Sequence, residues 1–294
     1  MDNHRKSDMC TMIWYHLKSM RIIVAVVTIL FLGTFFIVHD QPRAYSLGER
    51  EPVPVPAQLD PMVDEVSASA WALFDVANGE VLVGDNIVTK KPIASITKLF
   101  TAFVAFEAGM EEHSVLITPA MVATEGGAGK LHSGVTMSIR ELVFPLLIES
   151  SNDAAVAIRE GVGADFDTHV KNIIHDAHLM DTRIVDASGL DSKNVSTVTD
   201  MARWFSYIYK NNRHILDITQ LPMYIGAHDG YVNNDPAIHT EGFIGGKQGF
   251  LDEARYTFVG AFLRSDGTSV GVALLGSENI SEDINVLLDY YDAR

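Results

Sequence analysis

Two stretches with the pattern of β-hairpins lie near opposite ends of the chain. Residues 69–86, SAWALFDVANGEVLVGDN, have apolar runs on either side of Asn78-Gly79, a pair suited to the positive φ angles of a tight turn. Residues 254–277 repeat this arrangement around Asp266-Gly267. The long region between the hairpins has helical periodicity, so the order of elements is strands, a helical insert, and strands again.

Start and stop signals divide the region between the hairpins into helices. Residues 92–109 begin with Pro92 and end with Gly109, which predicts a helix that has proline in its first turn. Ser138 and Glu141 have the spacing of a capping box at the start of a second helix, and Pro145 should kink that helix. Further helices are predicted at residues 152–161, 165–179 and 199–212, and a terminal amphipathic helix at residues 280–291.

The N-terminal part of the chain differs from the rest. Residues 22–38 carry no charge, and their number falls within the roughly 17–25 residues that cross a bilayer as a helix. Basic residues precede this segment, so the positive-inside rule predicts that residues 1–21 are cytoplasmic. A signal peptide cleaved after Ala44-Tyr45-Ser46 is the alternative to an uncleaved signal anchor, and both export the residues that follow.

The exported part is predicted to be a linker followed by one folded domain. Residues 39–62 contain alternating valine and proline, which favours an extended linker. The domain is expected at residues 63–294, on the extracytoplasmic side of the cell membrane, with its helical insert at about residues 100–240. The net charge of −16 argues against nucleic acid as a partner, and the single cysteine, Cys10, provides neither a disulfide framework nor a thiolate zinc site.

Ser95 is the only serine in the chain with a lysine three positions later, at Lys98. Residues three apart share a helix face, so the Lys98 amine can reach the Ser95 hydroxyl. Apolar neighbours at Leu99, Phe100 and Phe103 favour the neutral amine, which is the form that can act as a base. Taken alone, however, Ser-x-x-Lys also fits an ordinary helix start with a solvated lysine.

A Ser-x-Asn pattern occurs three times, so its context has to separate a site from chance. Ser150-Ser151-Asn152 lies between two strongly helical stretches, where a short turn can direct both side chains into a cleft. A plain loop is the alternative for this segment. The other two matches lie in a polar loop, at residues 192–194, and behind a late strand, at residues 277–279.

Lys247-Gln248-Gly249 is the only Lys-x-Gly in the chain, and it precedes a predicted strand. A strand edge beside a nucleophilic serine can supply a cation for a substrate carboxylate and a backbone N–H for an oxyanion. Gly249 allows a substrate backbone to approach closely.

In this order the three motifs resemble the Ser-x-x-Lys, Ser-x-Asn and Lys-Thr-Gly set of penicillin-binding proteins and serine β-lactamases. The surrounding segments are similar to those of the low-molecular-mass serine-type D-alanyl-D-alanine carboxypeptidases, peptidase family S11: KPIASITKLFTAFVAFE, GVTMSIRELVFPLLIESSNDAA, DASGLDSKNVSTVTDMA and IGGKQGFLDEARY. The resemblance runs from about Ser69 to the C-terminus. It implies an α/β fold of the α+β type, with an antiparallel sheet from the N- and C-terminal strands, flanking helices and a helical subdomain.

The resemblance also implies a reaction. Ser95 would attack the carbonyl between the two D-alanines of a peptidoglycan stem peptide, and Lys98 would take its proton as general base. Ser150 would relay a proton to the leaving amine, and Asn152 would orient the acyl amide. β-Lactam antibiotics would acylate Ser95 as mimics of the dipeptide.

The strand motif would bind substrate in this scheme. Lys247 would help to hold the terminal carboxylate of the peptide, and Gln248 and Gly249 would also bind substrate. The backbone N–H groups of Ser95 and Phe250 would form the oxyanion hole. No metal and no cofactor are implied.

Two departures from the family pattern bear on specificity. Gln248 stands where the family usually has threonine, and the late-strand segment LLGSENISED offers no basic residue for a free carboxylate. The alternatives to a carboxypeptidase are therefore a DD-endopeptidase of the same fold and a catalytically weak sensor of stem peptides. A β-lactamase is less favoured, since no deacylating glutamate is identified in the loop after Ser-x-Asn.

Overall fold

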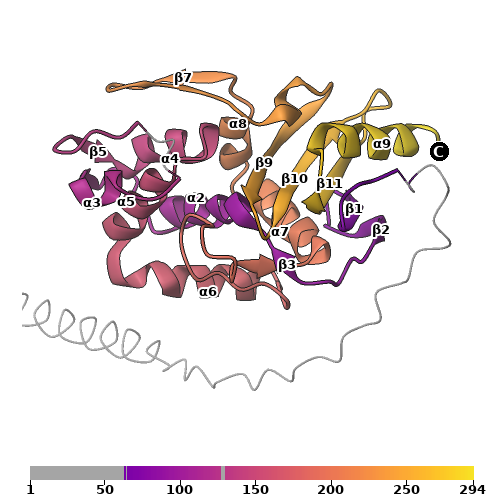
Figure 1. The fold of residues 1–294 in the computed structure, drawn as a ribbon, viewed down its shortest axis with the longest axis horizontal. Helices are drawn as coiled ribbons and strands as arrows, with labels where there is room; N and C mark the ends of the chain where they lie inside the picture. Colours follow the sequence, from indigo (N-terminus) through magenta and orange to yellow (C-terminus); the bar gives the residue numbers. More distant parts are fainter. Residues whose placement is uncertain (1–62, 64, 127–129) are drawn as a thin grey trace, which may run out of the picture. The chain divides into compact units, whose positions relative to one another are not determined.

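The two predicted hairpins pair with one another in a five-stranded antiparallel sheet (Figure 1). The computed structural model describes residues 63, 65–126 and 130–294. The strand order is β2-β1-β11-β10-β9, so strands from both ends of the chain are neighbours at the centre of the sheet. The strands are β1 (Ala70–Asp75), β2 (Val81–Asp85), β9 (Phe243–Leu251), β10 (Arg255–Leu263) and β11 (Ser269–Ser277).

The predicted turns and the predicted sheet are confirmed. Gly79 and Gly267 have φ angles of 73° and 86°, which glycine adopts without the steric cost of a side chain. The central pairing runs from Ala70 opposite Leu275 to Asp75 opposite Val270. Strands formed by distant parts of the sequence therefore hold the two ends of the domain together.

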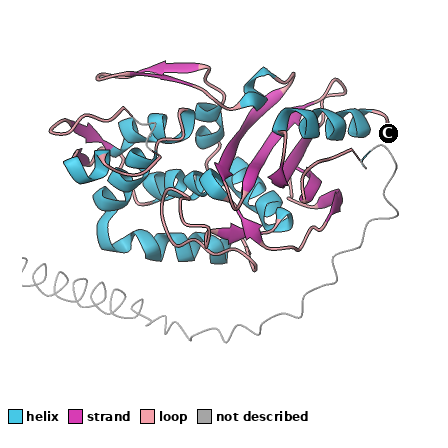
Figure 2. Cartoon of the chain, viewed as in Figure 1, coloured by secondary structure: helices cyan, strands magenta, loops and turns pink. Residues whose placement is uncertain are grey.

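Helices form most of the regular structure in the region between β2 and β9, as predicted (Figure 2). The short strand pairs β3 (Lys91–Pro92) with β6 (Val195–Ser196), β4 (Ser114–Leu116) with β5 (Thr136–Ser138), and β7 (Met223–Ile225) with β8 (Gly230–Val232) interrupt it. Its longer helices are α2 (Thr97–Glu107), α4 (Ile139–Ile148), α5 (Asn152–Val162), α6 (Phe166–Asp176) and α7 (Val198–Asn211). Shorter ones are η2 (Ala94–Ile96), α3 (Pro119–Val122), η3 (Gly163–Asp165), α8 (His214–Thr219) and η4 (Pro236–His239).

The predicted start of the first helix is wrong. Pro92 lies in β3, and α2 begins five residues later, after the single turn η2. The backbone N–H of Ile93 donates to the carbonyl of Asn194, 3.0 Å away, so pairing with a distant segment keeps Pro92 extended. The capping box at Ser138 and Glu141 is confirmed at the start of α4, which contains Pro145.

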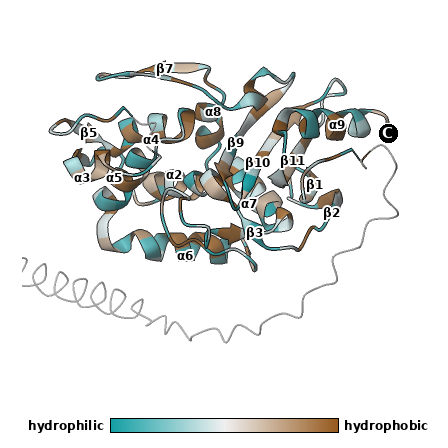
Figure 3. Ribbon diagram, viewed as in Figure 1, coloured by the Kyte–Doolittle hydropathy of each residue, from teal (hydrophilic) through white to brown (hydrophobic). Residues whose placement is uncertain are grey.

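Helix α2 is the buried centre of the domain. Its residues from Thr97 to Ala105 are all buried, and Phe100 stacks on Trp204 of α7 with ring centroids 4.2 Å apart. Helix α7 contacts β1 and β11 on one face of the sheet, whereas α9 (Ile280–Asp292) covers the other face. The buried apolar residues form two clusters, one on either face of the sheet. Hydrophobic residues are brown in Figure 3.

The N-terminal predictions concern residues that the structure does not describe. The cytoplasmic segment 1–21, the anchor 22–38 and the linker 39–62 all lie outside the described residues. Within the described part of the chain, every helix is too short or too polar to span a bilayer.

A buried carboxylate ties the last helix to the start of the domain. Asp283 accepts hydrogen bonds from the Ser67 N–H at 2.7 Å, the Ser67 hydroxyl at 2.9 Å and the Ser277 hydroxyl at 2.6 Å. Asp283→Ala leaves these donors without a partner and should lower the free energy of unfolding by about 3 kcal/mol in urea denaturation. Glu282→Ala, on the exposed side of the same turn, is the control, and equal stability of the two variants would contradict this role.

Candidate active site

Ser95 and Lys98 are within hydrogen-bonding distance, as their spacing predicted. Ser95 lies in the turn η2, directly before α2, and the Lys98 Nζ is 2.9 Å from its Oγ. The turn is fixed from the sheet side, because the Thr257 hydroxyl of β10 donates to the Ile93 carbonyl at 2.9 Å. The serine is therefore presented by a short turn held between the sheet and a buried helix.

Lys98 has no exposed surface, and its ordinary solvation is replaced by protein groups. Its Nζ donates to Asn152 Oδ1 at 2.7 Å and to the Ser188 carbonyl at 2.6 Å. Burial lowers the pKa of Lys98 well below its usual value, and the positive charge of Lys247 lowers it further. Asp186 and Asp153 oppose this shift, but the net direction favours the neutral amine.

The turn between α4 and α5 carries the Ser-x-Asn pair. Ser150 has a φ of 62° and lines the cleft, while Ser151 caps α5 by accepting from the Ala154 N–H. Asn152 starts α5, and its Nδ2 donates to the carbonyls of Glu125 and Gly126 at 3.0 and 3.1 Å. These bonds aim the Asn152 oxygen at Lys98.

The asparagines of the other two Ser-x-Asn matches have structural contacts. The Asn194 Oδ1 accepts from the Val185 N–H at 2.6 Å. Asn279 caps α9, where its side chain accepts from the Glu282 N–H. Of the three matches, the one that context favours supplies Asn152, whose oxygen accepts from Lys98 Nζ.

Strand β9 brings Lys247 to the opposite side of the site. Lys247 is 1% exposed, and its Nζ donates to the carbonyl of Gln248 at 2.9 Å. Burial lowers the pKa of Lys247 to about 8, although the negative charge of Asp235 raises it. Burial raises the pKa of Asp235 in turn, and the Lys247 charge counteracts that rise. Lys247 is therefore expected to lose its proton at a lower pH than an exposed lysine.

The Gln248 side chain is tied to a neighbouring loop. Its Nε2 donates to the Asn234 carbonyl at 2.7 Å, and its backbone N–H donates to Asp235 Oδ2 at 2.8 Å. The Asn234 amide also reaches the Glu149 carbonyl at 3.3 Å, next to Ser150. Gln248 therefore belongs to a network that joins β9 to the Ser-x-Asn turn.

These elements enclose a cleft of about 500 Å³, a volume suited to a small ligand. Phe250, which is 46% exposed, stands on its wall beside Tyr256. The predicted residues that line the cleft are Ser95, Ser150, Asn152, Gln248, Gly249 and Phe250.

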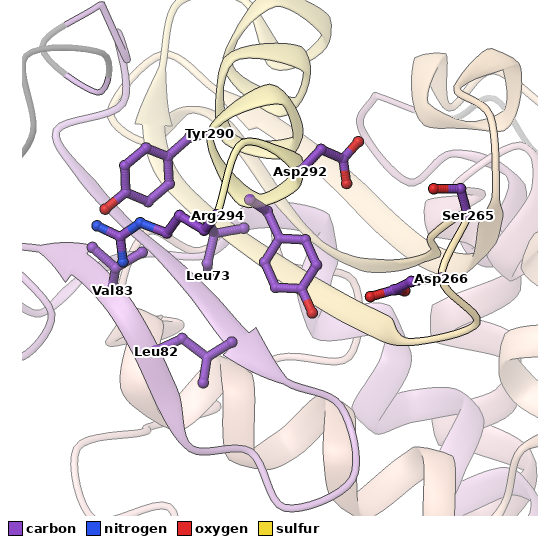
Figure 4. Close-up of a pocket in the computed structure, with 9 residues that line it drawn as sticks. Leu73, Leu82, Val83, Ser265, Asp266, Tyr290, Asp292 and Arg294 are labelled. Carbon is purple, nitrogen blue, oxygen red and sulfur yellow. The ribbon is translucent and has the colours of Figure 1, made fainter.

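A second depression, of about 440 Å³, lies between the β1–β2 hairpin and the end of α9 (Figure 4). Its lining includes Leu82, Tyr290 and Arg294, and the Arg294 guanidinium lies over the Tyr290 ring, 4.2 Å from its centroid. None of the predicted site residues is in this lining.

Two groups of residues at the site carry no motif in the sequence. The loop at residues 233–235 holds Gln248, and the turn at residues 186–191 supplies the carbonyl that binds Lys98. The aspartate and glycine of DASGLD are turn signals, but they do not show which distant side chain the turn contacts.

Comparison with known proteins agrees with the resemblance seen in the sequence. A family model described as D-alanyl-D-alanine carboxypeptidase, of peptidase family S11, matches residues 57–278. The D-alanyl-D-alanine carboxypeptidase DacB2 of Mycobacterium tuberculosis is 30% identical over 71% of this chain and 74% of its own length. A D-alanyl-D-alanine endopeptidase of Haemophilus influenzae is 27% identical, over 65% of this chain and 69% of its own.

A solved structure supports the fold. Penicillin-binding protein D2 from Listeria monocytogenes, in its ampicillin-bound form, superposes with a TM-score of 0.68 and 28% identity. The match covers 78% of this chain and 97% of that one. Other curated relatives are covered less fully: the chain spans half the length of the D-alanyl-D-alanine endopeptidase of Pseudomonas aeruginosa.

Gly249 should be intolerant of a side chain. A Cβ at this position would lie 2.5 Å from the Ser95 nitrogen and 2.8 Å from Thr257 Oγ1, so β9 would have to move away from the serine turn. We expect Gly249→Ala to lower the free energy of unfolding by about 1–3 kcal/mol in urea denaturation. Gly230→Ala is the matched control, because an added Cβ there meets nothing within 4 Å. Equal stability of the two variants would show that the contact is not tight.

Proposed function

The chain belongs to the D-alanyl-D-alanine carboxypeptidase family, and on that premise we propose that it removes the terminal D-alanine of peptidoglycan stem peptides through an acyl-enzyme on Ser95. The observation that carries the proposal is the buried Lys98 amine, 2.9 Å from the Ser95 hydroxyl. A serine hydroxyl is a weak nucleophile and needs an adjacent base. A neutral lysine held at hydrogen-bonding distance supplies that base.

The contacts of Lys98 suit this role when the amine is neutral. A neutral amine has two N–H bonds and one lone pair, and two acceptors, Asn152 Oδ1 and the Ser188 carbonyl, take the two N–H bonds. The lone pair then faces Ser95 Oγ and accepts the hydroxyl proton. Protonation of Lys98 would remove this lone pair, so acylation requires the pH to exceed the lowered pKa of Lys98.

The reaction consumes only the peptide and one water molecule. Ser95 Oγ bonds to the carbonyl carbon between the two D-alanines as its proton passes to Lys98. The C–N bond breaks, and the leaving D-alanine amine takes a proton that we assign to relay through Ser150, which lines the same cleft. Water then attacks the ester and restores the Ser95 hydroxyl.

Three further roles are proposed for the residues around the scissile bond. Asn152 orients the acyl amide, since its own amide is fixed by two backbone carbonyls. The backbone N–H groups of Ser95 and Phe250 stabilise the oxyanion. Lys247 holds the terminal carboxylate, with Gln248 and Gly249 on the same strand.

We also propose that the enzyme is anchored in the cell membrane by residues 22–38, with the domain on the extracytoplasmic side. The uncharged segment and the basic residues before it support this placement. Inhibition by β-lactams is proposed as well, supported by the ampicillin-bound relative from Listeria monocytogenes.

A soluble form of the domain allows the acyl-enzyme to be tested directly. We expect covalent labelling by fluorescent penicillin and release of D-alanine from a pentapeptide that ends in D-Ala-D-Ala, both abolished by Ser95→Ala. Ser192→Ala, in the second Ser-x-Asn match, should behave as the wild type. Labelling of the Ser95→Ala variant, or intact pentapeptide after incubation with the wild type, would contradict the proposal.

Endopeptidase activity is a second candidate, favoured by the Haemophilus influenzae relative of that name and by the glutamine at position 248. Parallel digestion of a cross-linked peptide dimer separates the two. Faster cleavage of the dimer than of the pentapeptide would indicate an endopeptidase. A stem-peptide sensor would bind either peptide and form no acyl-enzyme.

The pKa of Lys247 predicts how substrate binding depends on pH. Its ammonium is present below about 8 and is lost as the pH rises through that value. KM for a peptide with a free terminal carboxylate should therefore rise above this pH, by up to about tenfold per pH unit. KM for the same peptide with a terminal amide is the control and should change little, because no carboxylate faces Lys247. A parallel rise for both peptides would contradict carboxylate binding by Lys247.

A further inference from the structure

The turn at residues 186–191 is built around one carboxylate. Asp186 Oδ1 accepts from the Ser188 N–H at 2.6 Å, the Ser188 hydroxyl at 2.8 Å and the Gly189 N–H at 2.6 Å. Its Oδ2 accepts from the Asp191 N–H at 2.8 Å and from Asn194 Nδ2 at 2.9 Å. Five hydrogen bonds to one side chain leave the backbone of this turn little freedom.

This turn lies directly against the nucleophile and its base. The Ser188 carbonyl accepts from Lys98 Nζ at 2.6 Å, and the Ala187 carbonyl accepts from the Thr101 hydroxyl of α2, also at 2.6 Å. Gly189 has a φ of 90°, and a Cβ there would lie 2.0 Å from the Ala94 carbonyl oxygen. The turn therefore contacts α2 and the serine turn at the same time.

Asp186 also contributes charge to the site. The charged groups that act on Lys98 are Lys247, which lowers its pKa, and Asp186 and Asp153, which raise it. Burial raises the pKa of Asp186, but hydrogen bonds from the Asp191, Gly189 and Ser188 groups outweigh burial and keep the pKa below its usual value. Asp186 is thus an anion throughout the pH range in which Lys98 would act.

We propose that Asp186 is a positioning residue for acyl transfer, which acts through the Ser188 carbonyl to orient the Lys98 amine toward Ser95. The inference rests on the proposed function. A neutral amine that loses one of its two acceptors rotates, and its lone pair no longer points at the Ser95 hydroxyl. Asp186 is not among the residues that line the cleft, so its effect on the rate passes through this carbonyl and through the charge that it places near Lys98.

Asp186→Asn tests the proposal against Asp191→Asn, which removes the same charge from the same turn. The Asp191 carboxylate accepts a hydrogen bond from the nearby Lys193 N–H. It is not among the charged groups that shift the pKa of Lys98. The second-order rate constant for acylation by a fluorescent penicillin is measured across pH for the wild type and both variants.

We expect Asp186→Asn to slow acylation by about tenfold to hundredfold, the usual cost of a misplaced catalytic group. The acidic limb of its pH–rate profile, where the rate falls as Lys98 is protonated, should move to lower pH. The reason is that removal of the anion lowers the pKa of Lys98 further. Asp191→Asn should match the wild type. If the wild type is acylated rapidly and the pH profiles of Asp186→Asn and Asp191→Asn are indistinguishable, the proposal is overturned. If the wild type is not labelled at all, the proposed function is contradicted instead.

If Asp186→Asn is not folded, as shown by the lack of a cooperative unfolding transition, Thr101→Val tests the proposal instead. It releases the same turn at the Ala187 carbonyl without a change in charge. The rate constant should fall while the acidic limb stays in place. A folded Thr101→Val variant with the wild-type rate would show that the position of this turn does not control Lys98.

Discussion

The arrangement of the site depends on the burial of the Lys98 side chain. An ammonium group without solvent costs several kcal/mol, so the protein has to compensate the charge or keep the amine neutral. Two carboxylates and a carbonyl act near Lys98, yet burial and the neighbouring Lys247 still favour the neutral form. That imbalance converts an ordinary lysine into a base beside a serine.

The fold keeps Lys98 out of water by burying α2 among the other helices of the insert, while the serine turn η2 lies against β9 and β10. One side of Lys98 faces the turn at residues 186–191, another faces Asn152 at the start of α5, and the third faces Ser95. Each neighbour belongs to a different part of the chain, and the antiparallel sheet brings β9 against the serine turn as well.

Local patterns predicted the parts of the structure that depend on nearby residues. The glycines of both hairpin turns, the capping box at Ser138, and the reach from Lys98 to Ser95 all follow from spacings of a few residues. The start of α2 was predicted wrongly, because Pro92 is held in a strand by residues about a hundred positions away. The Ser188 carbonyl, 90 residues from Lys98, carries no signal of its own, since any residue type has a carbonyl.

The ionisation of Lys98 is the most direct test, and ¹⁵N NMR of lysine side chains measures it without substrate. The Lys98 Nζ signal can be assigned by its loss in Lys98→Met and followed through a pH titration. We predict that Lys98 loses its proton at a lower pH than the exposed lysines and is a neutral amine while they are still charged. A Lys98 signal that stays an ammonium through neutral pH and titrates together with the surface lysines would contradict it.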